Sequence, residues 1–344
     1  MQNHHPLSQL VLARFREQLR QPEVLFWVFA FPLLLAVALG LAFRNRPPDT
    51  VRVAVEAGPA ADSVATVLGR ARGFTVQVLP PPAAAEQLRK GRVALVVVAG
   101  ATILYRYDST RTESRMARLA TDDALQRGLG RREARPVTDQ TVMERGSRYI
   151  DFLIPGLLGL NLMGTGMWGL GYAVVDARKK KLMKRLLASP MRKSHYLLSF
   201  IFARLTMLVP EVVLLIGFGM LVFGVPMRGS VVNFLLLAVL GAMCFAGIGL
   251  LTASRARTTE TANGLMNLIM MPMWILSGVF FSSANFPAAM QPFIRVLPLT
   301  ALNDALRAVM LDGASLAAVA GPAAICAAWG VGAFAIALRI FRWL

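Results

Sequence analysis

Cysteine, histidine and acidic side chains are scarce in this sequence. Its 344 residues include two cysteines, three histidines and 19 Asp or Glu, against 37 Lys or Arg. Cys244 and Cys326 both lie in apolar runs, so the chain offers neither a disulfide framework nor a Cys/His zinc pattern. His4 and His5 stand apart from any carboxylate or cysteine cluster. The sequence therefore predicts no metal site and no cofactor held by this chain.

A phosphate-binding loop is also missing. The pattern G-x-x-x-x-G-K-[ST] does not occur, and the dipeptide Gly-Lys is absent altogether. The sequence therefore does not predict that this chain binds and hydrolyses ATP through such a loop.

The abundant residues are apolar and basic. Hydrophobic residues make up 56% of the chain, and the net charge is +18. Mean hydropathy is +0.54, which is typical of a membrane protein. Lys and Arg accumulate in cytoplasmic loops of such proteins, beside anionic lipid headgroups. No motif that reads bases accompanies the charge, so we expect membrane lipid and no nucleic acid as a partner.

Six apolar runs are long enough to cross a bilayer as helices. The first is longer than the apolar part of a typical signal peptide, so a retained anchor is favoured over a cleaved one. Glu211 is essentially the one acid within these runs, and we expect it to be protonated or paired. The runs cover residues 24–43, 152–175, 205–227, 231–253, 262–281 and 314–338.

The distribution of basic residues predicts the orientation. Residues 176–197 carry eight Lys or Arg against one Asp, and the positive-inside bias places this segment in the cytoplasm. Both termini are then cytoplasmic. The expected organisation is a cytoplasmic interfacial helix in 1–23, a first transmembrane helix in 24–46, an extracytoplasmic domain in 47–148, and the remaining transmembrane helices in 149–344.

The predicted outer domain alternates between strand and helix patterns. "VRVAVEA", "FTVQVLP", "VALVVVA" and "TILYRYD" are typical of strands, and amphipathic segments lie between and after them. The order predicts a small β-α-β-α-β-β-α domain. Asp122 and Asp123 adjoin on its last helix, where we expect solvated carboxylates and not an acid/base pair.

Two further segments favour partly buried positions. The run 152–175 contains six glycines, which permit close helix packing in lipid. Residues 284–313 are too rich in proline and polar groups for lipid and too apolar for a free loop. We expect short helices there that re-enter the outer leaflet, shielded by protein.

A short amphipathic helix is predicted inside the basic segment. Leu182, Met183, Leu186 and Leu187 recur at helical spacing, and Ser189-Pro190 should end the helix. Its apolar stripe could lie on lipid headgroups or dock into a groove on a cytoplasmic partner.

The chain resembles the ABC-2 type permeases, the membrane subunits of ABC exporters with the type V fold. The resemblance lies in "RFREQLRQPEVLFWVFAFPLLLAVALGLAF", "RYIDFLIPGLLG", "MKRLLASPMRKSHYLLS" and "LSGVFFSSANFPAAMQPFIRVLPLTALNDALRAVML", in this order. It implies an α-helical integral membrane protein with an N-terminal interfacial helix, six transmembrane helices, re-entrant helices before the last span, and a coupling helix near 178–190. The family's acid-Arg-acid-x-Gly run is replaced here by Asp-Ala-Arg-Lys-Lys-Lys at 176–181.

The resemblance also implies partners and a location. The expected partners are two copies of a separate ABC ATPase that binds ATP and Mg, and a second permease in a C2 homodimer. The expected location is a bacterial inner membrane. The expected cargo is a lipid, an amphipathic drug or a glycolipid moved outward. The expected ATPase-docking residues are Arg178, Lys181, Leu182, Met183, Arg185, Leu186 and Leu187. The expected substrate path contains Asn161, Thr165, Met167, Trp168, Asn263, Met266, Asn267, Met270 and Trp274.

The competing hypotheses are an integral-membrane enzyme and a sensor with an extracytoplasmic ligand-binding domain. An enzyme should place carboxylates, histidines or metal ligands at the membrane edge. A sensor should carry a cytoplasmic signalling domain. Neither feature is evident in the sequence.

Overall fold

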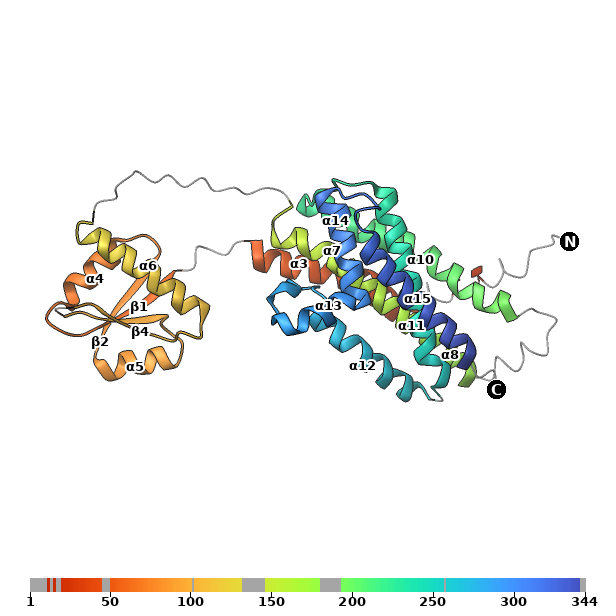
Figure 1. Ribbon diagram of the computed structural model, residues 1–344, viewed down its shortest axis with the longest axis horizontal. Helices are drawn as coiled ribbons and strands as arrows, with labels where there is room; N and C mark the ends of the chain where they lie inside the picture. Colours follow the sequence, from red (N-terminus) through yellow and green to blue (C-terminus); the bar gives the residue numbers. More distant parts are fainter. Residues whose placement is uncertain are drawn as a thin grey trace. The chain divides into compact units, whose positions relative to one another are not determined.

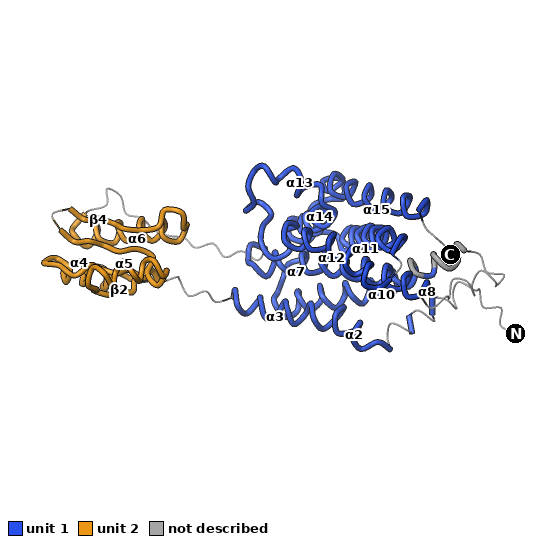
Figure 2. The backbone as a smooth tube through the Cα atoms, turned by 90° about the horizontal axis from the view of Figure 1, so that it is seen from below, with its two compact units in different colours: residues 1–44, 142–344 blue, residues 45–141 orange. Residues whose placement is uncertain are grey.

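The computed structural model divides into two compact units (Figures 1 and 2). Unit 1 comprises Met1–Arg44 and Val142–Leu344, and unit 2 is Asn45–Thr141. The residues that the structure describes are 11–12, 15–16, 20–44, 50–100, 102–131, 146–179, 193–256 and 258–340.

Unit 2 is built on a four-stranded sheet in the order β2-β1-β3-β4. Strand β1 pairs in parallel with β2 and β3, and β3 pairs antiparallel with β4. The order of elements is the one that the sequence pattern predicts. The elements are β1 (Val51–Glu56), α4 (Ala61–Arg70), β2 (Phe74–Leu79), α5 (Pro81–Arg89), β3 (Leu95–Val98), β4 (Leu104–Tyr107) and α6 (Thr112–Gly128).

The two faces of the sheet are covered unequally (Figure 1). Helices α4 and α6 pack over one face, where Val53, Val55, Leu95 and Val97 form the larger core. On the other face the core is small and involves α5 alone. Alternate residues of a strand point to opposite faces, so the run of consecutive apolar residues in β3 supplies both cores.

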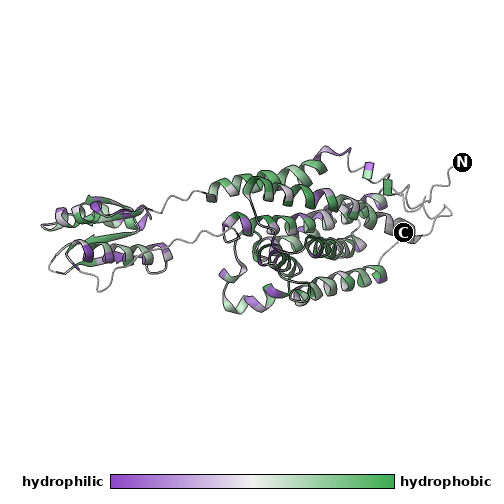
Figure 3. Ribbon diagram, turned by 90° about the horizontal axis from the view of Figure 1, so that it is seen from above, coloured by the Kyte–Doolittle hydropathy of each residue, from purple (hydrophilic) through white to green (hydrophobic). Residues whose placement is uncertain are grey.

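Unit 1 is a helical bundle whose helices are mostly apolar along their lengths (Figure 3). Among the described residues, five helices are long and apolar enough to cross a membrane: Pro22–Phe43, Tyr149–Arg178, Phe202–Phe223, Val231–Arg255 and Ala320–Ile340. The elements are α2 (Pro22–Leu25), η1 (Phe26–Ala30), α3 (Phe31–Arg44), α7 (Tyr149–Gly164), η2 (Thr165–Gly169), α8 (Leu170–Lys179), α10 (Lys193–Phe223), α11 (Val231–Arg255), α12 (Thr259–Leu276), η3 (Ser283–Asn285), η4 (Ala288–Met290), α13 (Gln291–Val296), α14 (Pro298–Asp312) and α15 (Ala320–Ile340).

The second candidate span is central to this bundle. Helix α7 packs against α3, α10, α11 and α14, and η2 and α8 pack against α11. Of its most apolar window, 72% is buried, against 17% for the first and last candidate spans. The peripheral helices consequently present apolar surface that lipid or another chain would have to cover.

The fifth apolar run differs from its expected extent. Helix α12 stops at Leu276, because Ser277 is not helical and Gly278 has a φ of +67°. A glycine at positive φ is a common way to end a helix. Helix α12 has 18 residues, but it is less apolar than the five candidate spans and is not among them.

Candidate functional site

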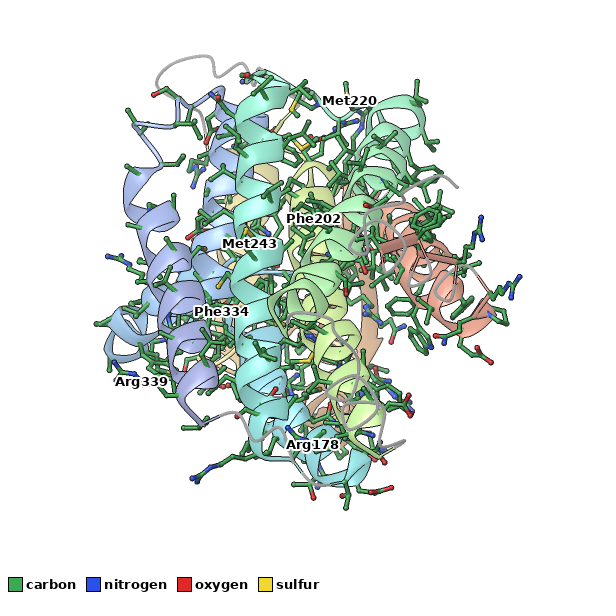
Figure 4. All side chains as sticks on the ribbon, turned by 90° about the vertical axis from the view of Figure 1, so that its right-hand side faces the viewer. Arg178, Phe202, Met220, Met243, Phe334 and Arg339 are labelled. Carbon is green, nitrogen blue, oxygen red and sulfur yellow. The ribbon has the colours of Figure 1, made fainter. Side chains whose placement is uncertain are left out.

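Arg178 ties the end of α8 to the end of α11. Its Nη1 donates to the carbonyl oxygens of Ala253 at 3.3 Å and Ala256 at 2.7 Å, and its Nη2 donates to that of Ser254 at 3.2 Å. The last carbonyls of a helix have no partner within the helix, and a cation there also interacts favourably with the helix dipole. Figure 4 shows Arg178 and Arg339 at one end of the bundle and Met220 at the opposite end. Arg178 therefore fixes the point from which the chain continues into the predicted coupling helix.

The other predicted docking residues lie outside the described residues. They are Lys181, Leu182, Met183, Arg185, Leu186 and Leu187. Most of the predicted interfacial helix in 1–23 lies outside them as well.

One residue of the predicted path, Asn161, joins two helices inside the bundle, and a second, Thr165, bonds to it along the same helix. The Nδ2 of Asn161 donates to the carbonyl oxygen of Val28 at 2.8 Å, and Thr165 Oγ1 donates to that of Asn161 at 2.7 Å. Val28 lies in η1 and Thr165 begins η2, and both segments are π-helical. In a π-turn, i→i+5 hydrogen bonds replace the i→i+4 bonds of an α-helix. Some carbonyl groups are then left without a backbone partner and can accept hydrogen bonds from side chains. The contact joins the first and second candidate spans through their irregular turns.

The remaining predicted path residues divide between buried and exposed positions. Met167, Met266 and Met270 are buried within the chain. A Cβ on Gly171 would collide with Met266, so α8 and α12 approach closely there. Trp168 and Asn263 are half-buried, whereas Asn267 and Trp274 are exposed on α12. A path used by all of these residues would require helices to move, and their role in transport stays a prediction.

Glu211 is paired, as the sequence leads one to expect. Its Oε2 lies 2.7 Å from Nη1 of Arg204, and both residues lie on the same face of α10. The Glu211 side chain is 0% exposed and that of Arg204 is 12% exposed. Arg204 follows the basic segment 176–197 and lies within the candidate span Phe202–Phe223. Glu211 Oε1 and two nitrogens of Arg204 have no hydrogen-bond partner among the described residues.

A second buried acid, Asp151, lies just before the apolar run 152–175. The second candidate span begins at Tyr149 and includes the fully buried Asp151. Asp151 Oδ2 accepts hydrogen bonds from the backbone of Gly146 at 2.8 Å and Arg148 at 3.1 Å, and its Oδ1 accepts one from Arg148 Nη2 at 2.7 Å. The hydrogen bond from the Arg148 side chain to Asp151 raises the pKa of Arg148 above its usual value. A carboxylate in the first turn interacts favourably with the positive end of the helix dipole. This interaction explains why Asp151 is tolerated at a buried position.

Arg307 joins three segments at the same end of α7. Its Nε donates to the carbonyl oxygen of Phe152 at 3.1 Å, its Nη2 donates to that of Gly278, and its guanidinium lies 3.6 Å from the centre of the Phe152 ring. Asn303, one turn earlier, donates to the carbonyl of Ser277 at 3.1 Å. Arg307 lies in the predicted re-entrant segment 284–313, and its side chain is only 12% exposed. Its contacts can be recognised only from the packing of α14 against α7, and not from the local sequence.

Glycines of α7 make this packing possible. A Cβ on Gly156 would lie 2.7 Å from Arg307 Nη2 and 2.8 Å from the carbonyl oxygen of Val279, and one on Gly159 would collide with Oδ1 of Asn303. The glycines thus serve close helix packing, as predicted for this span. Within the described residues, no group of three or more His, Cys, Asp or Glu is placed to hold a metal ion.

Comparison with known proteins supplies the family. The model of a family described as ABC-2 family transporter protein matches residues 22–339. The chain is 26% identical over 180 residues to ABC transporter G family member 20 of Dictyostelium discoideum, which covers 52% of this chain. It is 24% identical over 168 residues to the probable multidrug ABC transporter permease YbhR of Escherichia coli, covering 49% of this chain. It is 26% identical over 186 residues to the linearmycin resistance permease protein LnrN of Bacillus subtilis, covering 51% of this chain.

These alignments are partial. They span 25% of the first relative and 46% of each of the other two. The family model, in contrast, extends from α2 to the last turn of α15. The chain belongs to the ABC-2 family of transporter proteins.

Proposed function

We propose that this chain is the membrane-spanning permease subunit of an ABC exporter. The observation that carries the proposal is the family match over residues 22–339. The apolar bundle supports it, since five of its helices are suited to cross a membrane. ATP and Mg are bound by a separate ATPase subunit, because the 344 residues contain no phosphate-binding loop.

The proposed topology has six spans, with α12 as the fifth. Helix α12 is about 27 Å long at 1.5 Å per residue, close to the thickness of a bilayer core. Its outward side is apolar despite its low mean hydropathy. The exposed residues that support this assignment are Leu265, Leu268, Met271, Trp274 and Ile275. Both termini and the segment after Arg178 are then cytoplasmic, unit 2 is extracytoplasmic, and α13 and α14 re-enter the membrane from outside.

The ATPase docks on the segment that follows Arg178. Because Arg178 bonds to the end of α11, a push on that segment would reach α8 and α11 together. The interior of unit 1 is linked further through Asn161 and Val28 to the first span. Two ATPase subunits and two permease copies form the proposed complex, with a C2 axis between the permeases.

Part of the proposed substrate path lies on the exposed side of α12. Asn267, Met271 and Trp274 follow one another at spacings of four and three residues, so they share a helix face. Adaptable methionine and aromatic side chains suit a lipid, an amphipathic drug or a glycolipid. The names of YbhR and LnrN, a multidrug permease and a linearmycin resistance permease, favour amphipathic cargo for this chain too. The proposed setting is a bacterial inner membrane.

The docking claim is tested by replacing Leu186 and Leu187 with Asp in a complex reconstituted with its ATPase. We expect the substrate-stimulated ATPase rate to fall, because the substitution removes the apolar stripe, while the permease still inserts and dimerises. The double variant Arg70→Gln with Arg72→Gln, in unit 2, lowers the net charge by the same two units and controls for that general effect. Unchanged coupled ATPase activity in the Asp variant would assign the stripe to lipid headgroups, and failure to co-purify any ATPase would contradict the proposed function as a whole.

A further inference from the structure

Unit 2 contains a groove with an apolar floor and a basic rim. It has a volume of about 360 Å³ and lies between α5, β3 and β4. The floor includes Ala85, Leu88 and Val96, and the rim includes Arg89, Arg106 and Arg111. Tyr107 and Asp108 complete the lining.

The groove exists because α5 covers only part of its face of the sheet. The small core beneath α5 contains Ala54, Ala84 and Val96 but no residue of β4. Val96 and Arg106 are directly opposed in the antiparallel register, so their side chains emerge on the same face. The apolar side of β3 thus continues into a charged edge strand with no helix over it.

The three arginines differ in how far their charge is already satisfied. Arg106 Nη1 lies 2.8 Å from Oε2 of Glu56, and Arg111 Nε lies 3.4 Å from Oδ2 of Asp108. Arg89 is exposed in the last turn of α5 and forms no ion pair among the described residues. Arg89 and the terminal nitrogens of Arg111 therefore keep donors for a ligand.

The carboxylate in the lining is already occupied. Asp108 Oδ1 accepts hydrogen bonds from the backbone of Thr110 at 2.9 Å and from its hydroxyl at 2.6 Å. These bonds lower the pKa of Asp108, so it remains ionised and keeps Arg111 in place. A Cβ on Gly91 would lie 2.7 Å from Nη1 of Arg111, so the guanidinium rests against the turn after α5. This arginine is held over the groove before any ligand arrives.

We propose that this groove binds a small anionic amphiphile, with a phosphate or carboxylate headgroup on Arg89 and Arg111 and a short alkyl segment on Ala85 and Leu88. Guanidinium groups bind such oxyanions through paired hydrogen bonds. A neutral ligand would leave the free donors of Arg89 and Arg111 unused, and an inorganic anion would leave the apolar floor uncovered. The volume suits one headgroup with a short chain and is at the small end for ligand pockets. The site lies within unit 2, so it does not depend on the proposed role in ATP-driven export.

The test uses the full chain in nanodiscs of phosphatidylcholine, which has no net charge, with hexyl phosphate as the probe. Hydrogen exchange measured by mass spectrometry reports where the probe binds, and a titration of the effect gives its affinity. We expect slower exchange in residues 81–111 alone. Hexyl glucoside and inorganic phosphate should each bind at least about tenfold more weakly, the loss expected when one set of contacts is missing.

Two variants address the contacts directly. Arg89→Gln with Arg111→Gln removes the free donors, and Ala85→Glu places a negative charge in the groove from an exposed helix position. Each should weaken hexyl phosphate binding at least about tenfold. Arg70→Gln with Arg72→Gln, which alters exposed charges at the end of α4, should leave it unchanged. Unperturbed exchange in β1 and β3 checks that each variant is folded.

Several outcomes overturn the proposal. Equal binding of hexyl glucoside would reduce the groove to a nonspecific apolar surface, and equal binding of inorganic phosphate would reduce it to an anion site. Wild-type affinity in Ala85→Glu and in the Arg89/Arg111 variant, or protection outside residues 81–111, would place binding elsewhere.

Discussion

Arg204 and Glu211 form an ion pair two helical turns apart on α10, with 2.7 Å between Nη1 and Oε2. The shared buried face and the seven-residue spacing bring the long arginine side chain to the carboxylate. A lone carboxylate in this apolar span would cost several kcal/mol. The ion pair offsets only part of this free energy of burial, since Glu211 Oε1 remains without a hydrogen-bond partner among the described residues.

The ion pair predicts a characteristic pattern of stabilities. Glu211→Gln and Arg204→Met should each lower the free energy of unfolding, by about 3 kcal/mol, because each leaves a buried group of the partner uncompensated. Arg204→Met with Glu211→Leu should recover most of that loss. Thermal unfolding of the purified protein in detergent measures all three, with Glu23→Gln, an exposed acid, as the control. Additive losses in the double variant would show that the two side chains are not coupled.

Arg178 should prove more important than its exposed neighbours. Arg178→Gln removes donors to three carbonyl groups and should destabilise unit 1 by about 2 kcal/mol, with a matching loss of coupled ATPase activity. Arg178→Lys should retain part of both, since an ammonium group reaches fewer of these oxygens. Arg255→Gln, at the same end of α11 and exposed, is the matched control. Equal effects of the two Gln variants would point to general charge and not to these bonds.

Two glycines of one helix give a paired test of the α7 and α14 contact. Gly159→Ala should destabilise the protein by about 1–3 kcal/mol, because the new Cβ would collide with Asn303. Gly164→Ala should be neutral or stabilising, since nothing lies within 4 Å of its Cβ position and alanine favours helix. Urea or thermal unfolding compares them. Identical effects would mean that α14 does not pack on α7 as described.

We propose that the exposed side of α12 that carries Asn267 faces the second permease, and cysteine cross-linking tests this. In a background with Cys244 and Cys326 changed to Ala, a cysteine at Asn267 should link two copies and respond to ATP. Met270→Cys should link poorly, because position 270 is 2% exposed within its own chain. Met243→Cys on α11, 48% exposed, serves as the lipid-facing control. Linking at 243 in place of 267 would move the interface to α11.

Tyr105 gives unit 2 a measurable response to alkaline pH. Burial, then a hydrogen bond donated to Asp122 Oδ1 at 3.0 Å, raises the pKa of Tyr105 from 10.0 to about 12. The protonated form is favoured in the folded state, so the associated stability is complete below pH 10.0 and is lost as the pH rises through about 12. Tyrosinate absorbance of the wild type minus that of Tyr105→Phe should titrate near this upper value. Tyr107→Phe, on the same strand, is the control; a difference titration near 10.0 would contradict the contact.

Hydropathy and periodicity were sufficient to predict much of the architecture. The apolar runs correspond to α3, α7 to α8, α10, α11 and α15 within a few residues at most ends, and the strand pattern gave the order of unit 2. These features depend on local composition. The extent of α12 was mistaken because the run remains apolar beyond Gly278, where backbone conformation ends the helix.

Side-chain partners were much harder to predict. The sequence does not show that the side chains of Arg204 and Arg307 are only 12% exposed, because this follows from how the helices pack. A signal was available for Arg204, because it precedes Glu211 by seven residues and so shares its helix face. No comparable local signal links Arg307 to Gly278 or Asn161 to Val28, since those contacts join segments far apart in the chain.

The π-helical segments η1 and η2 also affect how spans of different length can be compared. A π-turn holds one more residue than an α-turn over nearly the same rise. A related chain that lacked one residue within 165–169 could therefore keep Asp151 and Arg178 at their present ends of the span by closing η2 into regular helix. An insertion or deletion of a single residue here is absorbed locally, whereas the same change in α11 would rotate every later side chain by about 100°.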